Sequence, residues 1–224
     1  MVQHHPEASP EHPHLRDYGD WHEEYGDPAS ILSVRLRHVQ AAILDWLDRT
    51  PGPVRMLSSC AGQGHDVLGA LEQRGMADRA RVTGALVELH PTNASIARRR
   101  IAELRVALTV VEADAGSTDT YVGLVPCDLV LLSGIMGNIS TTDIQRLVRV
   151  SRQFCAPDAT VIWTRGAQDP DLGPDIRQWF QAAGFEELSC AEWIEGTGMR
   201  VGVHRLIGAP EPLRPGEPIF TFYR

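Results

Sequence analysis

The sequence contains no lysine: all 21 of its basic residues are arginine. This absence excludes catalysis through a Schiff-base lysine, and it excludes a Walker A loop, whose lysine binds nucleotide phosphates. The 29 acidic residues give a formal net charge of -8. An acidic chain has little attraction for the phosphate backbone, so we expect no nucleic-acid partner.

Paired cysteine motifs and long apolar runs are also missing. The 4 cysteines lack the CxxC spacing of zinc and redox sites. No apolar run approaches the ~20 residues that span a bilayer, and the N-terminus lacks the apolar region of a signal peptide. We therefore expect reduced cysteines, no bound metal, no membrane partner and a cytoplasmic protein.

Segments typical of strands and helices alternate along most of the chain. Strands are expected at 54–59, 82–88, 106–113, 127–134 and 159–165, and a terminal hairpin at 185–194 and 199–208. Helices are expected from Pro28 to about 51 with Asp27 as N-cap, and at 66–75, 92–104, 141–154 and 172–183. This order predicts an α/β fold: a doubly wound, Rossmann-like, seven-stranded sheet, mainly parallel with an antiparallel C-terminal hairpin.

The two ends of the chain differ from this core in composition. Residues 1–14 are rich in His and Pro and are expected to be a disordered tail. Residues 15–50 hold an aromatic segment and the first helix, residues 51–208 form the core, and residues 209–224 form a Pro-rich tail that docks on the core.

The stretch VRMLSSCAGQGHD (54–66) places a glycine turn after the first strand. Ligands of doubly wound sheets bind at the carboxyl ends of the strands, where this turn lies. The turn is compatible with a dinucleotide, a nucleotide phosphate or another adenosine-bearing cofactor. Gly62 and Gly64 match two positions of the dinucleotide fingerprint G-x-G-x-x-G, but Val67 stands at the third. Together with the missing lysine, this departure counts against both phosphate ligands.

Two carboxylates follow the next two strands. Glu88 ends the second strand, where a carboxylate can accept hydrogen bonds from ribose hydroxyls. Asp114 follows the third strand, where it can accept from an adenine amino group. The alternatives are a solvated acid at a strand end and a loop cap. Taken together, the pair favours an adenosine attached to a group without phosphates.

At these residues the sequence resembles the class I S-adenosylmethionine-dependent methyltransferases, over roughly residues 30–208. The resemblance rests on MLSSCAGQGHDV, LVELHP, VEADA, CDLVLLSG and the terminal hairpin. The turn CAGQG is similar to that of small actinobacterial members. One departure is Ser58, which stands where the family usually has an acid that orients the cofactor's amino end.

The resemblance implies S-adenosylmethionine as cofactor, with residues 51–208 as its binding core and residues before the core as a lid. It also implies which residues form the cofactor site: Tyr18 and Tyr25 of the lid, with Cys60, Ala61, Gly62, Gly64, Glu88, Leu89, Asp114, Ala115, Ser133 and Gly134 of the core. The lid aromatics can instead simply pack on the core.

Methyl transfer from a sulfonium depends mainly on positioning, and a base is needed only when the acceptor loses a proton. His22 is the candidate base, because its ordinary pKa is near neutrality. Asn138 is a candidate to orient the acceptor, with a purely structural turn beside Gly137 as the alternative. The loop lacks the D/N-P-P-Y motif of enzymes that methylate nucleobase amino groups.

We therefore expect methyl transfer to an oxygen or nitrogen of a small molecule. The alternatives are a nicotinamide-dependent oxidoreductase with a degenerate fingerprint, and a cofactor-binding module without catalysis.

Overall fold

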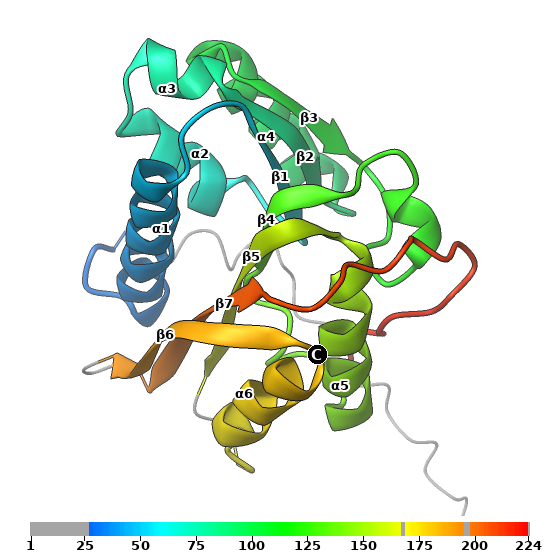
Figure 1. The fold of residues 1–224 in the computed structure, drawn as a ribbon. Helices are drawn as coiled ribbons and strands as arrows, with labels where there is room; N and C mark the ends of the chain where they lie inside the picture. Colours follow the sequence, from blue (N-terminus) through cyan, green and yellow to red (C-terminus); the bar gives the residue numbers. More distant parts are fainter. Residues whose placement is uncertain (1–26, 167–168, 195–197, 224) are drawn as a thin grey trace, which may run out of the picture.

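The protein is described by a computed structural model that covers residues 27–166, 169–194 and 198–223. Its centre is a seven-stranded sheet in the order β3-β2-β1-β4-β5-β7-β6 (Figure 1). The strands are β1 (Val54–Ser59), β2 (Val82–Val87), β3 (Ala107–Val111), β4 (Cys127–Leu132), β5 (Cys155–Gly166), β6 (Phe185–Ile194) and β7 (Met199–Leu206). The first five strands pair in parallel, whereas β7 is antiparallel to β5 and β6. The predicted fold class is confirmed.

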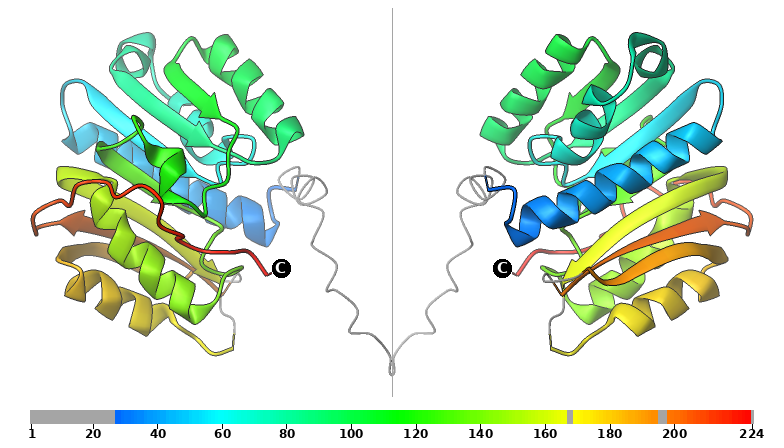
Figure 2. Two further views of the ribbon diagram at one scale, coloured as in Figure 1. Left: turned by 90° about the vertical axis from the view of Figure 1, so that its right-hand side faces the viewer. Right: turned by 90° about the vertical axis from the view of Figure 1, so that its left-hand side faces the viewer.

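Helices cover both faces of this sheet (Figure 2). One hydrophobic cluster is formed with α1 (Ile31–Arg49), α2 (His65–Glu72) and α4 (Pro91–Leu104). The other is formed with α5 (Thr141–Val150) and α6 (Gly173–Ala182). Short helical turns complete the connections: α3 (Met76–Ala80), η2 (Thr118–Tyr121) and η3 (Ser151–Gln153).

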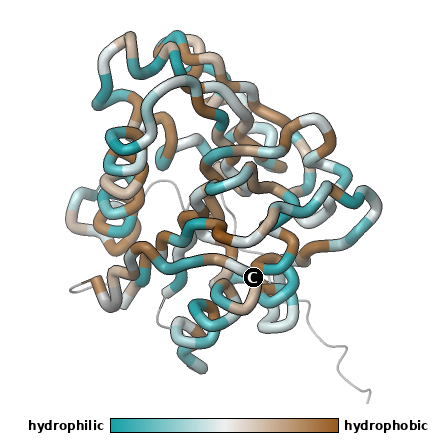
Figure 3. The backbone as a smooth tube through the Cα atoms, in the orientation of Figure 1, coloured by the Kyte–Doolittle hydropathy of each residue, from teal (hydrophilic) through white to brown (hydrophobic). Residues whose placement is uncertain are grey.

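The central strand β4 explains why the sheet is covered on both sides. Every residue from Leu129 to Leu132 is fully buried, so successive side chains enter opposite hydrophobic clusters. Apolar residues accordingly follow the strands, while polar residues mark the outer surfaces of the helices (Figure 3). This continuous apolar run is the pattern that predicts a strand buried on both faces.

Helix starts agree with the sequence in one case and differ in another. The Ser140 hydroxyl accepts from the Asp143 amide at 3.1 Å, as the capping pattern predicts, and α5 begins at Thr141. The predicted start of the first helix is wrong: α1 begins at Ile31 because the Ser30 hydroxyl caps it by accepting from the Ser33 amide. Two cap residues stand close together in this sequence, and Ser30 is the one adjacent to the apolar stripe.

After β7 the chain returns across the α5 face of the sheet to the carboxyl ends of the strands (Figure 2). We call residues 217–223 the return segment. Glu217 pairs with Thr118 of η2 through three hydrogen bonds of 2.9, 3.0 and 3.2 Å. The Ile219 amide donates to the Gly116 carbonyl at 2.7 Å. Ile219 and Phe220 are buried in the same cluster as α5. The return segment is therefore anchored on the connection between β3 and β4.

Candidate functional site

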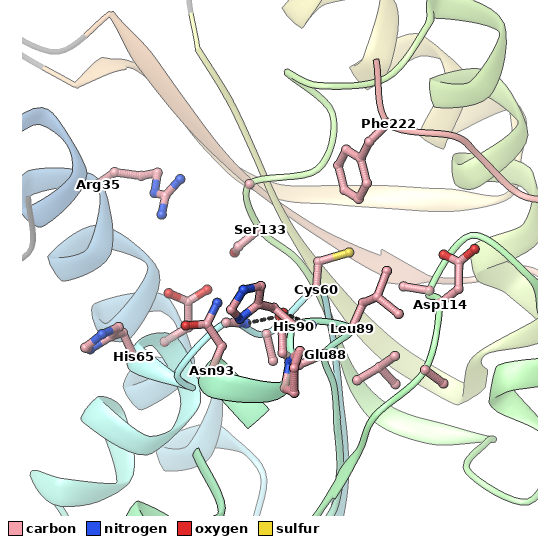
Figure 4. Close-up of a pocket in the computed structure, with 18 residues that line it drawn as sticks. Arg35, Cys60, His65, Glu88, Leu89, His90, Asn93, Asp114, Ser133 and Phe222 are labelled. Carbon is pink, nitrogen blue, oxygen red and sulfur yellow. Dashed lines mark hydrogen bonds between the residues drawn. The ribbon is translucent and has the colours of Figure 1, made fainter. Parts of the chain in front are cut away.

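A cavity of about 380 Å³ opens at the carboxyl ends of β1, β2, β3 and β4 (Figure 4). Its volume is in the range of sites that hold one small ligand. Many of the residues that the sequence analysis assigns to a cofactor site line this cavity: Cys60, Ala61, Gly62, Glu88, Leu89, Asp114, Ala115, Ser133 and Gly134. The parallel strands bring them together because their carboxyl ends meet at one edge of the sheet.

Two further predicted site residues, Gly64 and Asn138, are not among the described residues that line the cavity. Gly64 is the N-cap residue of α2, and the side chain of Asn138 donates to the Gly134 carbonyl at 2.8 Å. Tyr18, His22 and Tyr25 lie outside the described residues.

The turn after β1 has a left-handed backbone at three alternate positions. Cys60, Gly62 and Gly64 have φ angles of 53°, 55° and 74°. A Cβ on Gly64 would lie 2.7 Å from a methyl carbon of Leu68, so this glycine allows α2 to pack closely. Cys60 carries a side chain where glycine is favoured, which costs about 1–3 kcal/mol. The turn thereby presents the Cys60 thiol to the cavity.

Glu88 is held firmly at the cavity wall. Its carboxylate accepts from the Gly62 amide at 2.7 Å and from the His90 amide at 2.8 Å. The two bonds use one lone pair on each oxygen, which leaves each oxygen able to accept once more. Glu88 therefore joins the turns after β1 and β2 and can also receive hydroxyl donors from a ligand.

Beside Glu88, Leu89 and Asp114 form a surface suited to a planar ring with a donor group. Leu89 is a large apolar residue that is 64% exposed at the cavity. Asp114 is exposed, and its carboxylate is oriented by the Gly116 amide, which donates to it at 2.8 Å. The cavity wall thus combines an exposed apolar side chain with a carboxylate acceptor.

The opposite end of the cavity contains an arginine and a third carboxylate. Arg35 of α1 is only 3% exposed, and its guanidinium points into the cavity (Figure 4). Burial raises the pKa of the Asp66 carboxyl, while the nearby Arg35 guanidinium and Ser133 hydroxyl oppose this rise. This end therefore offers a cation and an acid within one ligand's reach.

Arg35 is not predicted from the sequence, although a signal is present. It lies on the stripe of α1 that also contains Leu32, Val39 and Ile43, where a charged residue is unexpected. Asp66 begins the helix expected at 66–75 but is not assigned to the site from the sequence. Asn93, His65, His90 and Phe222 also line the cavity, and none of them is assigned to the site from the sequence.

The middle of the cavity lies between these two polar ends. Figure 4 shows Arg35 on one side, Asp114 on the other, and Ser133, Cys60 and Phe222 between them. Burial and the carboxylates of Glu88 and Asp114 raise the pKa of the Cys60 thiol, so it stays protonated at neutral pH.

Within the described ranges, no group of three or more His, Cys, Asp and Glu side chains could hold a metal ion. In the same ranges, no helix has the length and apolarity needed to cross a membrane.

No protein-family model matches the sequence, and no curated protein matches it either. Solved structures do match. Magnesium protoporphyrin IX methyltransferase from Synechocystis PCC 6803, crystallised with S-adenosylmethionine, has a TM-score of 0.64 at 13% identity, covering 85% of this chain and 91% of that one. A TehB-like S-adenosylmethionine-dependent methyltransferase from Corynebacterium glutamicum has a TM-score of 0.52 at 17% identity, covering 74% and 86%.

A third match is a putative O-methyltransferase from Nostoc punctiforme, with a TM-score of 0.55 at 16% identity. It covers 78% of this chain and 57% of that one. At such identities the likeness shows the fold, which is the Rossmann-like fold of these methyltransferases.

Proposed function

We propose that the protein binds S-adenosylmethionine in this cavity and transfers its methyl group to an oxygen or nitrogen atom of a small molecule. The observation that carries this proposal is the distribution of charge along the cavity. Glu88 and Asp114 lie toward one end, and Arg35 lies at the other. Asp66 also lines the cavity and lies close enough to Arg35 for the guanidinium to oppose the rise in its pKa. S-adenosylmethionine has donor groups at its adenosine end and a zwitterionic amino acid at its other end, which matches this order.

The adenosine end fits the residues beside β2 and β3. Glu88 would accept from the ribose hydroxyls with the lone pairs that its backbone bonds leave free. Leu89 would pack on the adenine ring, and Asp114 would accept from the adenine amino group. Covering Leu89 would also remove exposed apolar surface from water.

The amino-acid end fits Arg35 and Asp66. A guanidinium binds a carboxylate through parallel hydrogen bonds, and a carboxylate binds an ammonium. Asp66 thereby supplies the acid that is missing at Ser58, whose side chain is buried inside the sheet. In this proposal the acid stands in the first turn of α2 and not at the end of β1.

The same charges count against a nicotinamide dinucleotide. Its pyrophosphate would lie near the turn after β1. Among the described residues that line the cavity, three are carboxylates and one is an arginine: Asp66, Glu88 and Asp114 against Arg35. Like charges in one binding site disfavour binding. S-adenosylmethionine carries a net positive charge, so the same residues attract it.

Bound S-adenosylmethionine would supply an activated methyl group, and this chain's residues would hold it for in-line attack. Glu88, Arg35 and Asp66 fix the two ends of the ligand. Because the Cys60 thiol stays protonated, it is a poor nucleophile and does not compete with the acceptor. The roles proposed for His22 as base and for the N-terminal lid concern residues outside the described ranges.

Calorimetric titration with S-adenosylmethionine and S-adenosylhomocysteine tests the proposal. We expect binding of both, and a Glu88→Ala variant that binds at least about tenfold more weakly through the loss of one or two charge-assisted bonds. Glu112→Ala is the matched control, because Glu112 lies outside the cavity in an exposed ion pair with Arg98. Absence of binding at millimolar ligand would overturn the proposal.

Two further measurements separate the alternatives. A fluorescence titration with NADH should show no binding, whereas an oxidoreductase would bind it. Formation of S-adenosylhomocysteine with a library of hydroxyl and amine acceptors separates an enzyme from a binding module without turnover.

A further inference from the structure

Phe222 reaches the cavity from a part of the chain remote from the other lining residues. It is half-buried and belongs to the return segment, which crosses from β7 to the carboxyl edge of the sheet. Its ring points toward the cavity beside Cys60 (Figure 4). The sequence predicts that this segment docks, but assigns it no part in the site.

Several contacts fix the position of this ring. Phe222 forms a β-bridge with Ile139, and the amide of Tyr223 donates to the Asn138 carbonyl at 3.1 Å. The ring also packs edge-on against the buried Phe220, with 5.3 Å between the ring centroids. Phe222 is therefore held by the loop after β4 on one side and by the core on the other.

The ring lies along the middle of the cavity, between the two polar ends. A ligand that placed its ribose on Glu88 and its amino-acid group on Arg35 would span this middle region, with its sulfur atom near Cys60 and Phe222. An aromatic face attracts a cation, and the attraction increases where water is excluded.

We propose that Phe222 contacts the sulfonium of bound S-adenosylmethionine and makes the site favour this charged donor over its neutral product. The inference rests on the proposed function. When the methyl group moves, a lone pair of the acceptor oxygen or nitrogen forms the new bond to the methyl carbon and the S–C bond breaks. The electron pair of the S–C bond stays on sulfur, and the acceptor's proton passes to water. The sulfur then becomes a neutral thioether, and the cation–π attraction to the Phe222 ring is lost. The ring thereby stabilises the substrate complex and weakens retention of the product.

The test compares the dissociation constants of S-adenosylmethionine and S-adenosylhomocysteine for wild type and Phe222→Leu. Leucine keeps apolar bulk on the return segment but removes the aromatic face. We expect the variant to bind S-adenosylmethionine about fivefold more weakly or worse, as the loss of a partly desolvated cation–π contact implies, and to bind S-adenosylhomocysteine within about twofold of wild type.

Two further variants make the result specific. Phe222→Tyr retains an aromatic face and should keep the wild-type ratio of the two constants. Tyr223→Ala alters the neighbouring residue, which is 46% exposed and does not line the cavity, and should also keep that ratio. Circular dichroism and thermal unfolding confirm that each variant is folded.

An equal loss of affinity for both ligands in Phe222→Leu would overturn the inference, because it would show that the ring only fills space. Unchanged affinity for both would overturn it as well. If the wild-type protein binds neither ligand, the proposed function fails and the inference fails with it. If the wild type binds both and the leucine variant keeps its ratio, only the inference about Phe222 fails.

Discussion

Asn138 joins the loop after β4 to the return segment. Its side-chain amide donates to the Gly134 carbonyl at 2.8 Å, and its backbone carbonyl accepts from the Tyr223 amide at 3.1 Å. One residue thus connects the wall that contains Ser133 and Gly134 with the segment that carries Phe222. Asn138 is not among the described residues that line the cavity, so we expect its side chain to affect the site only through these neighbours.

Replacing this side chain should loosen the loop after β4. In Asn138→Ala we expect the free energy of unfolding to fall by about 1 kcal/mol, because one partly buried hydrogen bond is lost. We expect both cofactor forms to bind more weakly by a similar factor, in contrast to the selective effect of Phe222→Leu. Asn138→Asp should be worse than alanine, because it places a carboxylate against a carbonyl oxygen. Urea unfolding and calorimetry measure these effects, and a wild-type-like alanine variant would contradict the role.

Because the backbone at Cys60 is left-handed, replacing this residue by a smaller one and by a larger one should change stability by different amounts. Cys60→Gly should leave stability within about 1 kcal/mol of wild type, since relief of strain offsets the greater freedom of glycine in the unfolded chain. Cys60→Val should lower stability by about 2 kcal/mol or more, because a β-branched residue fits this conformation poorly. Cys190→Val on the extended strand β6 is the control. If Cys60→Val lost less stability than Cys190→Val, the explanation would be contradicted.

The two ends of the cavity can be tested separately with a truncated ligand. Methylthioadenosine keeps the adenosine and the sulfur atom but lacks the amino-acid group. Arg35→Met and Asp66→Asn should therefore weaken the binding of S-adenosylhomocysteine by about tenfold or more, because charge-assisted bonds are lost. The affinity for methylthioadenosine should stay nearly unchanged. Glu88→Ala should weaken the binding of both ligands. Competition titrations measure this pattern, and an equal effect of Arg35→Met on both ligands would contradict the assignment of the amino-acid end.

His204 should make the free energy of unfolding depend on pH. It is buried against Phe180 and accepts at its Nδ1 from the Trp163 indole at 3.1 Å. Burial lowers its pKa to about 4, with the Glu187 carboxylate opposing this shift and Arg177 adding to it. The unfolded chain binds a proton near the ordinary value of 6.5, and the folded protein does not. Stability is therefore complete above about pH 6.5 and falls as the pH drops toward 4, by up to about 3 kcal/mol.

Urea unfolding at pH 7.5 and pH 5 measures this dependence. The variant His204→Gln, compared with wild type at both values, isolates the histidine from other titrating groups such as Asp66. We expect the variant to be less stable than wild type at pH 7.5 but to lose less stability on acidification. A parallel pH dependence in both proteins would contradict the role of His204.

The strands of the sheet can be predicted from the sequence, because each strand and each helix has its own local pattern of apolar and polar residues. The first strand is predicted at 54–59, where β1 lies. Glu88 and Asp114 follow from the same logic, since a residue at the end of a parallel strand is placed by the strand itself. What distinguishes these residues is their position in a regular element.

Other parts of the site depend on contacts that no local pattern encodes. Arg35 interrupts an apolar stripe, which marks it as unusual but does not say which ligand group it faces. The path of the return segment rests on pairs such as Glu217 and Thr118, which are separated by 99 residues. Short apolar sequences like IFTFYR dock in many ways, so the place of Phe222 comes only from the folded structure.

The route of the return segment also orders the events of biosynthesis. A nascent chain that has emerged as far as β4 already contains Glu88, Asp114 and Ser133. The Phe222 side chain is still missing from the cavity, because Phe222 is translated after β5, β6 and β7. Contacts across long sequence separations form late in folding. The pocket is thus complete only after every strand of the sheet has been synthesised. A partly synthesised chain lacks the ring that would discriminate donor from product.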